Sequence, residues 1–525
     1  MRKTCSLFCA LLVLASTLGA KAHAQTFSEA ELAYMPATKQ IELFKAGVIT
    51  PLQVLEAQIA RVAAYNGPLK KDTREELQNY LTFNGKVNAL CFERFAEARK
   101  AAKKAGERYR KGTARPLEGI TVGVKNENEV KGWRVDNGSV LTKDNPVCPG
   151  NGAIIDKLED AGAIFVFSTT VPEFYLSSMT WSKLYGVTRN PWNGFYGAGG
   201  SSGGSGAALA AGFCTLATGS DMGGSIRIPA SMNGVYGFKP PFGRVPTSNI
   251  SYETLGPLTR TFGDLVLMQN VLNGPSPKVM SSLRPRVEYP AGYEPLRGAK
   301  VAVCHFPNWI EGGLDRETKA AMDATVANLK AAGVQVDVIK LEWRARDFLD
   351  PFFMGLMSTS MYEIIEAARG KDLSKLCPYS EDVFKQQAQF GPKRLIEADT
   401  MQNAMHTEVQ KRIFEKGYTA LIMPNMATPH VPAELDATPE TKAVANGRLI
   451  RNSMENCLTP IWNLLCAYPV ISVPVGLSSK NVPIGLQVVG NTYDDLAAFR
   501  VASAISSVMP QLYSGGMFPD FRNAK

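Results

Sequence analysis

Residues 197–244 read GAGGSSGGSGAALAAGFCTLATGSDMGGSIRIPASMNGVYGFKPPFGR, and they decide how the rest of the chain is interpreted. Glycines and small residues surround two candidate serine hydroxyls, Ser201 and Ser225. Glycine is needed where backbone N–H groups must approach a reacting group or where φ must be positive. Most Gly/Ser-rich stretches are flexible linkers. Here apolar blocks at 207–211 and 213–217 and a rigid Ile-Pro-Ala interrupt the glycines, so we do not interpret the stretch as a linker.

Strand and helix patterns alternate on both sides of this stretch. Residues 119–125 (GITVGVK) alternate strictly, which predicts a strand that ends at Lys125. Residues 50–64 open with the cap Thr50 and Pro51 and continue with apolar residues at helical spacing, which predicts an amphipathic helix. Further helices are expected at 89–110, 151–162, 205–211 and 316–332, and further strands at 164–168, 299–304, 334–341, 420–423, 470–475 and 484–489. This alternation predicts an α/β fold in which helices cover a sheet.

The first 24 residues have the pattern of a secretory signal peptide. Arg2 and Lys3 precede an apolar core at 8–18, and residues 22–24 (Ala-His-Ala) form an A-x-A cleavage motif. The core is too short to span a bilayer. We therefore expect an exported protein, periplasmic or secreted, whose mature chain begins near Gln25 and does not insert into a membrane.

The composition is that of an ordinary globular protein. Hydrophobic residues make up 45% of the chain and charged residues 20%, which allows a sizeable core. The net charge of +9 is mild for 525 residues, and no basic run is interleaved with aromatic residues, so we do not expect a nucleic-acid partner. The cysteines and the four histidines stand in no metal-ligand or C-x-x-C spacing, so neither a metal site nor a disulfide framework is indicated. We expect the histidines to be buried residues without a ligand role, and a homodimer is left open.

Several blocks together resemble the amidase signature family. They are GAGGSSGGSGAALAAG (197–212), GSDMGGSIRIPASMNGVYGFKP (219–240), GITVGVK (119–125), TRNPWN (188–193), GPLTRTFGD (256–264) and YPVISVPVG with PIGLQVVG between 468 and 490. The blocks follow the order of the family and extend from the helix at Thr50 to near Val508. The resemblance implies one large α/β/α domain over 25–525 with a central mixed sheet, an N-terminal helical part at 25–115 and a substrate-pocket region at 275–455.

The resemblance also implies a Ser–Ser–Lys triad that needs no cofactor. On the matching positions, Ser225 is the nucleophile, Ser201 is the bridging serine after a cis peptide bond, and Lys125 is the base. A serine hydroxyl is a weak nucleophile that needs a base within reach. A lysine is a base only when it is neutral, which burial favours. Backbone N–H groups would form the oxyanion hole at Met222, Gly223, Gly224 and Ser225.

The implied reaction is hydrolysis of a small-molecule or peptide amide to a carboxylate and ammonia or an amine through an acyl-enzyme. Aliphatic, aryl, acyl-amino and C-terminal peptide amides all remain open as substrates. The same fold also serves as the glutaminase subunit of a tRNA-dependent amidotransferase, which the export signal disfavours because charged tRNA is cytoplasmic. Asn126 follows Lys125 where many members have aspartate, and Thr121 replaces a frequent proline, so the polarity around Lys125 differs from that of those members.

Other interpretations of the same residues are weaker. Ser201 and Ser202 each fit G-x-S-x-G, but no strand precedes them as a nucleophile elbow requires. We expect Ser202 to cap the 205–211 helix, and Asp221 and Arg227 to be structural, as an ion pair. Apolar residues at helical spacing are expected mainly in the core, with a pocket role as the lesser alternative, at Phe352, Phe353, Met354, Met357 and Met361.

Overall fold

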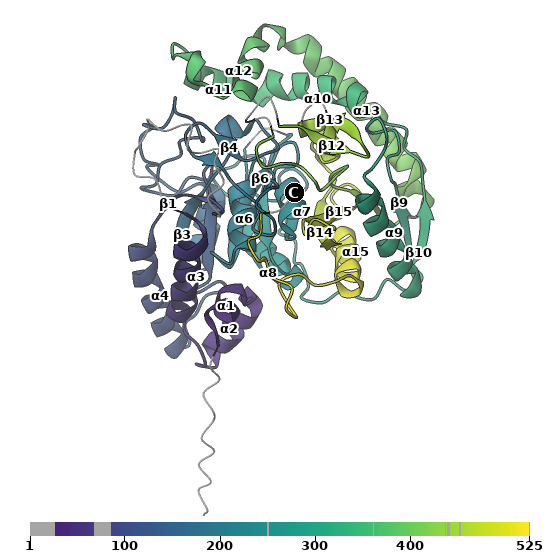
Figure 1. Ribbon diagram of the computed structural model, residues 1–525. Helices are drawn as coiled ribbons and strands as arrows, with labels where there is room; N and C mark the ends of the chain where they lie inside the picture. The colour runs from purple at the N-terminus through teal and green to yellow at the C-terminus, as the bar shows by residue number, and fades with distance from the viewer. Residues whose placement is uncertain are drawn as a thin grey trace, which may run out of the picture.

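A mixed sheet of 11 strands runs through the molecule (Figure 1). In order across the sheet, the strands are β1 (Leu90–Glu93), β3 (Ile164–Thr169), β2 (Thr121–Lys125), β6 (Leu216–Asp221), β8 (Thr254–Thr259), β7 (Tyr236–Lys239), β14 (Val470–Leu477), β15 (Pro483–Val489), β11 (Ala420–Pro424), β9 (Lys300–Val303) and β10 (Gln335–Val338). The pairs β3–β2, β2–β6, β11–β9 and β9–β10 are parallel, and the other neighbours are antiparallel. The expected central mixed sheet is therefore confirmed.

The structure is a computed structural model that describes residues 27–67, 86–248, 251–360, 362–435, 437, 441–450 and 453–523. The predicted signal peptide lies outside the described residues. Two short hairpins lie apart from the main sheet, and they are formed by β4 (Trp181–Ser182) with β5 (Gly186–Val187) and by β12 (Ala443–Ala445) with β13 (Arg448–Ile450). Within the described part of the chain, no helix combines the length and apolar character needed to cross a membrane.

Helices cover both faces of the first half of the sheet. One face packs against α3 (Pro51–Tyr65), α4 (Phe95–Arg110) and α6 (Gly203–Ala210), and the other against α2 (Ala37–Lys45), α5 (Ala153–Asp160) and α8 (Phe262–Leu272). Neighbouring side chains of β6 point to opposite faces of the sheet. Ala217 packs into the buried cluster under α3, α4 and α6, and Leu216 packs into the buried cluster under α2, α5 and α8. The predicted α/β/α layering is confirmed here.

The second half of the sheet is covered in the same way. On one face, α9 (Arg316–Ala331) and α15 (Asp495–Val508) pack against β14 and β15. On the other face lie α10 (Ala345–Ser360), α13 (Pro392–Arg412) and α14 (Ile461–Leu464). Together with α11 (Tyr362–Ala368) and α12 (Pro378–Lys385), α10 and α13 form an arc along one end of the molecule (Figure 1). The remaining helices are α1 (Glu29–Tyr34) and α7 (Arg227–Asn233).

Most of the elements predicted from the sequence are present within a few residues of their expected ends. Thr50 caps α3 through a hydrogen bond to the Gln53 N–H, as expected. The prediction of a helix over 89–110 is wrong at its N-terminal end, where residues 90–93 form a strand, β1. This strand pairs antiparallel with β3. Ser202 is the residue that precedes α6, but its hydroxyl makes no capping hydrogen bond and instead lies 3.4 Å from the Ser220 carbonyl oxygen.

Candidate active site

Lys125 stands at the end of β2, in which every residue is buried. Its Nζ lies 2.8 Å from Ser201 Oγ and 2.6 Å from Ser220 Oγ. Glu127 Oε2 lies 2.7 Å from the same Nζ, an electrostatic contact without hydrogen-bond alignment. The ring centre of Tyr175 is 5.0 Å away. Nζ donates a hydrogen bond to each of the two hydroxyls, Ser201 Oγ and Ser220 Oγ.

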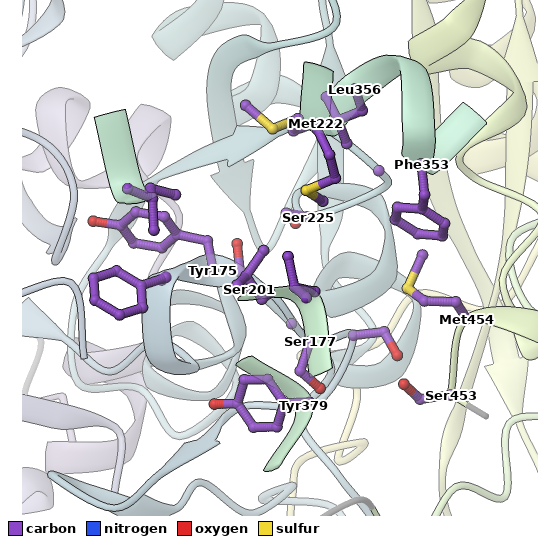
Figure 2. Close-up of a pocket in the computed structure, with 18 of the residues that line it drawn as sticks. Tyr175, Ser177, Ser201, Met222, Ser225, Phe353, Leu356, Tyr379, Ser453 and Met454 are labelled. Atoms are coloured by element: carbon purple, nitrogen blue, oxygen red, sulfur yellow. The ribbon is translucent and has the colours of Figure 1, made fainter. Parts of the chain in front are cut away.

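Both candidate serines line one cavity of about 670 Å³. Ser201 is almost completely buried, whereas Ser225 is partly exposed to the cavity. In Figure 2 the two serines lie near the centre of the view, with Tyr175 on one side and Phe353 on the other. Among the described residues, Ser225 Oγ makes no hydrogen bond to Ser201. The structure thus brings Lys125 and Ser201 into contact and places Ser225 in the same cavity.

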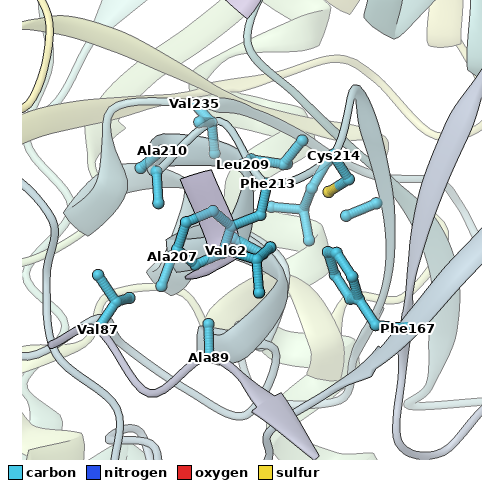
Figure 3. Close-up of a cluster of buried hydrophobic side chains, with 14 of the residues drawn as sticks. Val62, Val87, Ala89, Phe167, Ala207, Leu209, Ala210, Phe213, Cys214 and Val235 are labelled. Carbon is cyan, nitrogen blue, oxygen red and sulfur yellow. The ribbon is translucent and has the colours of Figure 1, made fainter. Parts of the chain in front are cut away.

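Ser201 is held at the start of a closely packed helix. The peptide bond between Gly200 and Ser201 is cis, as the family resemblance implies. The small residues of α6 allow close approach, since a Cβ added at Gly204 would lie 2.4 Å from the Thr170 nitrogen. Farther along α6, the side chains pack into the cluster that Figure 3 shows with Val62 and Phe167. This packing fixes the loop that carries Ser201.

Ser225 lies in the loop between β6 and α7, and Asp221 organises that loop. The Asp221 carboxylate accepts hydrogen bonds from the backbone N–H groups of Gly224 at 2.9 Å and Ile226 at 3.2 Å. It also pairs with Arg227 at 2.8 Å, and both side chains are completely buried. Burial alone would raise the pKa of Asp221, but the charge and hydrogen bonds of Arg227 hold it below its usual value. The predicted structural ion pair is therefore confirmed.

The hydrogen bonds of Asp221 occupy one of the four backbone N–H groups that were expected to form the oxyanion hole. Because the Gly224 N–H donates to Asp221, it is not free to bind a developing negative charge. The N–H groups of Met222, Gly223 and Ser225 have no hydrogen-bond acceptor in the described ranges. The structure thus leaves three of the four expected donors available and differs from the sequence expectation at Gly224.

Two carboxyl groups lie beside the candidate triad and were not identified from the sequence. Glu127 and Glu253 both line the cavity. The Glu253 carboxylate accepts a hydrogen bond of 3.0 Å from Ser248 Oγ. Burial, and next the neighbouring charge of Glu127, raise the pKa of Glu253 to about 8. At neutral pH the cavity therefore holds one protonated carboxyl next to the carboxylate that faces Lys125.

Ser220 is a further site residue that was not identified from the sequence, where it stands between Gly219 and Asp221. On β6, Thr218 accepts a hydrogen bond from the Lys125 backbone N–H, and Ser220, two residues later on the same face, contacts the Lys125 Nζ. This Thr-x-Ser alternation in β6, the strand next to the one that ends at Lys125, is the signal that could have indicated Ser220.

Helix α10 supplies more of the cavity wall than the sequence predicted. Phe352 belongs to the core, as expected. Phe353, Met354 and Met357 line the cavity, so the lesser alternative, a pocket role, holds for them. The side chain of Met361 lies outside the described residues.

A possible cation-binding group lies away from this cavity. Ligand atoms of Asp315, Glu317 and His430 lie within 4.8 Å of one another. Glu317 already accepts hydrogen bonds from the backbone N–H and hydroxyl of Ser479. His430 is partly exposed rather than fully buried as expected. The seven cysteines of the described chain are free thiols, at positions 91, 148, 214, 304, 377, 457 and 466.

Comparison with known sequences finds one protein family and many individual proteins that are similar to this chain. The profile of the amidase family matches residues 73–498. The A subunit of the glutamyl-tRNA(Gln) amidotransferase of Anaeromyxobacter dehalogenans is 30% identical over 493 residues, which cover 88% of this chain and 93% of that protein. The corresponding protein of the same name from Deinococcus radiodurans is 29% identical over 510 residues, covering 91% of this chain and 98% of its own length.

Solved structures share the fold. A bacterial aryl acylamidase of the amidase signature family superposes with a TM-score of 0.78 at 24% identity, covering 90% of this chain and 96% of its own. A 6-aminohexanoate cyclic dimer hydrolase bound to its substrate also gives a TM-score of 0.78 at 24% identity, over 94% of this chain and all of its own. At this level of identity these likenesses establish the fold.

Proposed function

The chain belongs to the amidase family, and from this premise we propose that it hydrolyses a carboxamide through an acyl-enzyme on Ser225. Lys125 is the proposed base and Ser201 the proposed bridge between base and nucleophile. The observation that carries this proposal is the fully buried Lys125 Nζ, 2.8 Å from Ser201 Oγ in the cavity that also exposes Ser225.

In the proposed reaction, protons pass along the three side chains. Neutral Lys125 takes the proton of Ser201 while Ser201 takes the proton of Ser225. Ser225 Oγ then bonds to the amide carbon, and the charge on the carbonyl oxygen is stabilised by the N–H groups of Met222, Gly223 and Ser225. The C–N bond breaks as the proton returns through Ser201 to the leaving nitrogen. Water attacks the ester, and the carboxylate leaves with Ser225 restored.

Covalent labelling tests the nucleophile directly. We expect a fluorophosphonate probe to modify the purified protein at Ser225, and Ser225→Ala to lose both labelling and about a thousandfold or more of amide hydrolysis. Ser202→Ala is the matched control, because it removes a neighbouring buried hydroxyl that the proposal leaves outside the triad, and it should keep labelling and most of the activity. Labelling of another serine, or near-normal turnover by Ser225→Ala, would contradict the assignment.

The second candidate function is that of a glutaminase subunit. The relatives from Anaeromyxobacter dehalogenans and Deinococcus radiodurans carry the name of an amidotransferase subunit, which is the observation in its favour. The two functions separate in a simple assay. Release of ammonia or amine from a simple amide by the purified chain alone supports the hydrolase, whereas activity only on glutamine and only with a second subunit supports the alternative.

Two further expectations complete the proposal. We propose that the protein is exported, and N-terminal sequencing of the protein from the producing cell tests this, since the mature chain should begin near Gln25. We also propose that the segment 275–455 adapts the pocket to its substrate. Helices α10 and α12 fall in this segment, and both contribute residues to the cavity wall, which supports the second expectation.

A further inference from the structure

We propose that the substrate is a carboxamide that carries a bulky apolar group and no carboxylate. This inference rests on the proposed function and specifies its substrate class. It depends on two properties of the cavity around Ser225, the apolar wall and the sign of the charged groups.

The apolar wall comes from several elements that converge on Ser225. Helix α10 contributes Phe353, Met354 and Met357, the loop after β6 contributes Met222, and the short helix at Ser453–Asn456 contributes Met454. Figure 2 shows Phe353, Met222 and Met454 around the cavity. Met354 and Met357 are buried side chains that line the cavity. An apolar substrate group placed here would leave water for a wall of apolar side chains, which favours binding in proportion to the apolar area buried. Methionine and phenylalanine side chains also adapt to aryl and alkyl groups alike.

The charged groups of the cavity share one sign. Glu127 lies at the inner end beside the protonated Glu253, and Asp350 and Asp382 lie on α10 and α12, where their side chains are exposed. Among the lining residues that the structure describes, none is lysine, arginine or histidine. Lys125, which stands behind the lining, already faces Glu127 at 2.7 Å, and Arg394 at the rim lies 3.5 Å from Asp350.

A substrate carboxylate would therefore meet an unfavourable environment. A carboxylate that leaves water is costly unless a cation and hydrogen-bond donors receive it. Here the cations beside the cavity face carboxylates of the protein, and the other charged lining groups would repel it. A neutral amide avoids this cost, and an amide with a distant ammonium group would not be repelled by Asp350 and Asp382. The same reasoning disfavours glutamine, whose amide stands on a chain that ends in an α-carboxylate.

A matched substrate series tests both properties. Pentanamide, 5-aminopentanamide and glutaramate (5-amino-5-oxopentanoate) have chains of similar length that end in a methyl group, an ammonium group and a carboxylate. Acetamide and 4-phenylbutanamide differ in apolar bulk. We expect kcat/KM for 4-phenylbutanamide to exceed that for acetamide at least thirtyfold, and kcat/KM for glutaramate to fall at least thirtyfold below that for pentanamide, with 5-aminopentanamide within threefold of pentanamide.

Variants show whether the wall itself makes the distinction. Phe353→Ala and Met357→Ala should lower kcat/KM for 4-phenylbutanamide at least tenfold more than for acetamide. Ile396→Ala is the matched control, because it also truncates an apolar side chain of the helical arc, but on α13 where the side chain is exposed. It should leave the ratio between the two substrates unchanged.

Binding to the Ser225→Ala protein separates this inference from the proposed function. Calorimetry on this variant requires no turnover, so it reports recognition even if no amide is hydrolysed. Tighter binding of 4-phenylbutanamide than of acetamide, and weak binding of glutaramate, support the inference whether or not the wild type hydrolyses them. Equal binding of the bulky and small amides, or binding of glutaramate within threefold of pentanamide, would overturn it, while hydrolysis of any of these amides by the wild type would leave the proposed function intact.

Discussion

Glu127 holds a carboxylate oxygen 2.7 Å from the Nζ of Lys125 at the inner end of the cavity. Glu127 follows Lys125 by two residues, so the contact joins the end of β2 to the turn after it. The ring centre of Tyr175 lies 5.0 Å from the same Nζ. In the proposed mechanism Lys125 must meet Ser201 in a fixed geometry, so we expect Glu127 to position the Lys125 side chain.

Replacing Glu127 with glutamine should lower kcat/KM. The substitution keeps the shape of the side chain and removes the charge that faces the Lys125 Nζ at 2.7 Å. We expect kcat/KM to fall by about tenfold, because Lys125 loses one of the contacts that position it. Glu129→Gln is the control, because Glu129 lies two residues farther on and is exposed. A Glu127→Gln variant with the kcat/KM of the wild type would show that this contact does not position the base.

Glu253 should make the fold less stable as the solution becomes alkaline. Its pKa rises from an ordinary value near 4.5 to about 8 in the folded protein, so the folded state holds one more proton than the unfolded state between these values. Stability then falls as pH rises through this window and is fully present below it. Urea unfolding should show a smaller loss between pH 5 and pH 8.5 for Glu253→Gln than for the wild type. The exposed Glu415→Gln should behave as the wild type.

Ser220 and Ser201 both contact the Lys125 Nζ, but their substitutions should differ in cost. Ser201→Ala removes a group that carries a proton in the proposed reaction, and we expect kcat to fall by about a hundredfold to ten-thousandfold. Ser220→Ala removes a hydrogen bond that orients the amine, and the expected loss is about tenfold. Comparable losses in the two variants would indicate that Ser220 also carries a proton, and steady-state kinetics on one amide is sufficient to decide.

Asp221→Asn should weaken both the fold and the site. The substitution leaves the buried Arg227 without its counter-charge, although Gln487 and Asn463 still accept hydrogen bonds from the guanidinium. Breaking a buried ion pair on one side costs about 3–5 kcal/mol. It also weakens the acceptor that fixes the N–H groups of Gly224 and Ile226. Urea unfolding measures the first effect, and kcat at a temperature where the variant is folded measures the second.

The contact of Lys125 with Ser201 was implied by the resemblance to the amidase signature family, but its surroundings were not. The strict alternation at 119–125 predicted the strand that ends at Lys125, and the match of the Gly/Ser blocks to the family indicated which serine it would meet. Glu253 precedes β8 by one residue, and Ser220 lies on β6 between β2 and β8. Only this strand order brings Lys125, Ser220 and Glu253 together, and the local sequence pattern does not reveal the order of the strands.

The same limit explains the error at 89–110. Residues 95–110 carry a clear helical pattern, and the residues before them were assigned to it. Leu90 and Phe92 instead pair with Thr169 and Ser168 of β3, a partner more than 70 residues away. Pairing with a distant strand overrides the local preference of a short segment. The pocket role of Phe353 and Met357 was only the lesser alternative for a related reason, since helical spacing shows that a face is apolar but not whether it meets a core or a cavity.

Gly224→Ala should inactivate the protein, and Gly223→Ala is its matched control. Gly224 has φ +120, which an alanine rarely adopts, and a Cβ there would lie 1.9 Å from Thr459 Oγ1. A Cβ at Gly223 would meet nothing closer than Met454 Cε at 3.8 Å. Because the displaced loop carries the proposed oxyanion donors, we expect Gly224→Ala to lower kcat about a hundredfold or more and Gly223→Ala to have a much smaller effect. If Gly224→Ala instead kept wild-type kcat, the position of this loop would not matter for catalysis, and the oxyanion hole would have to lie elsewhere.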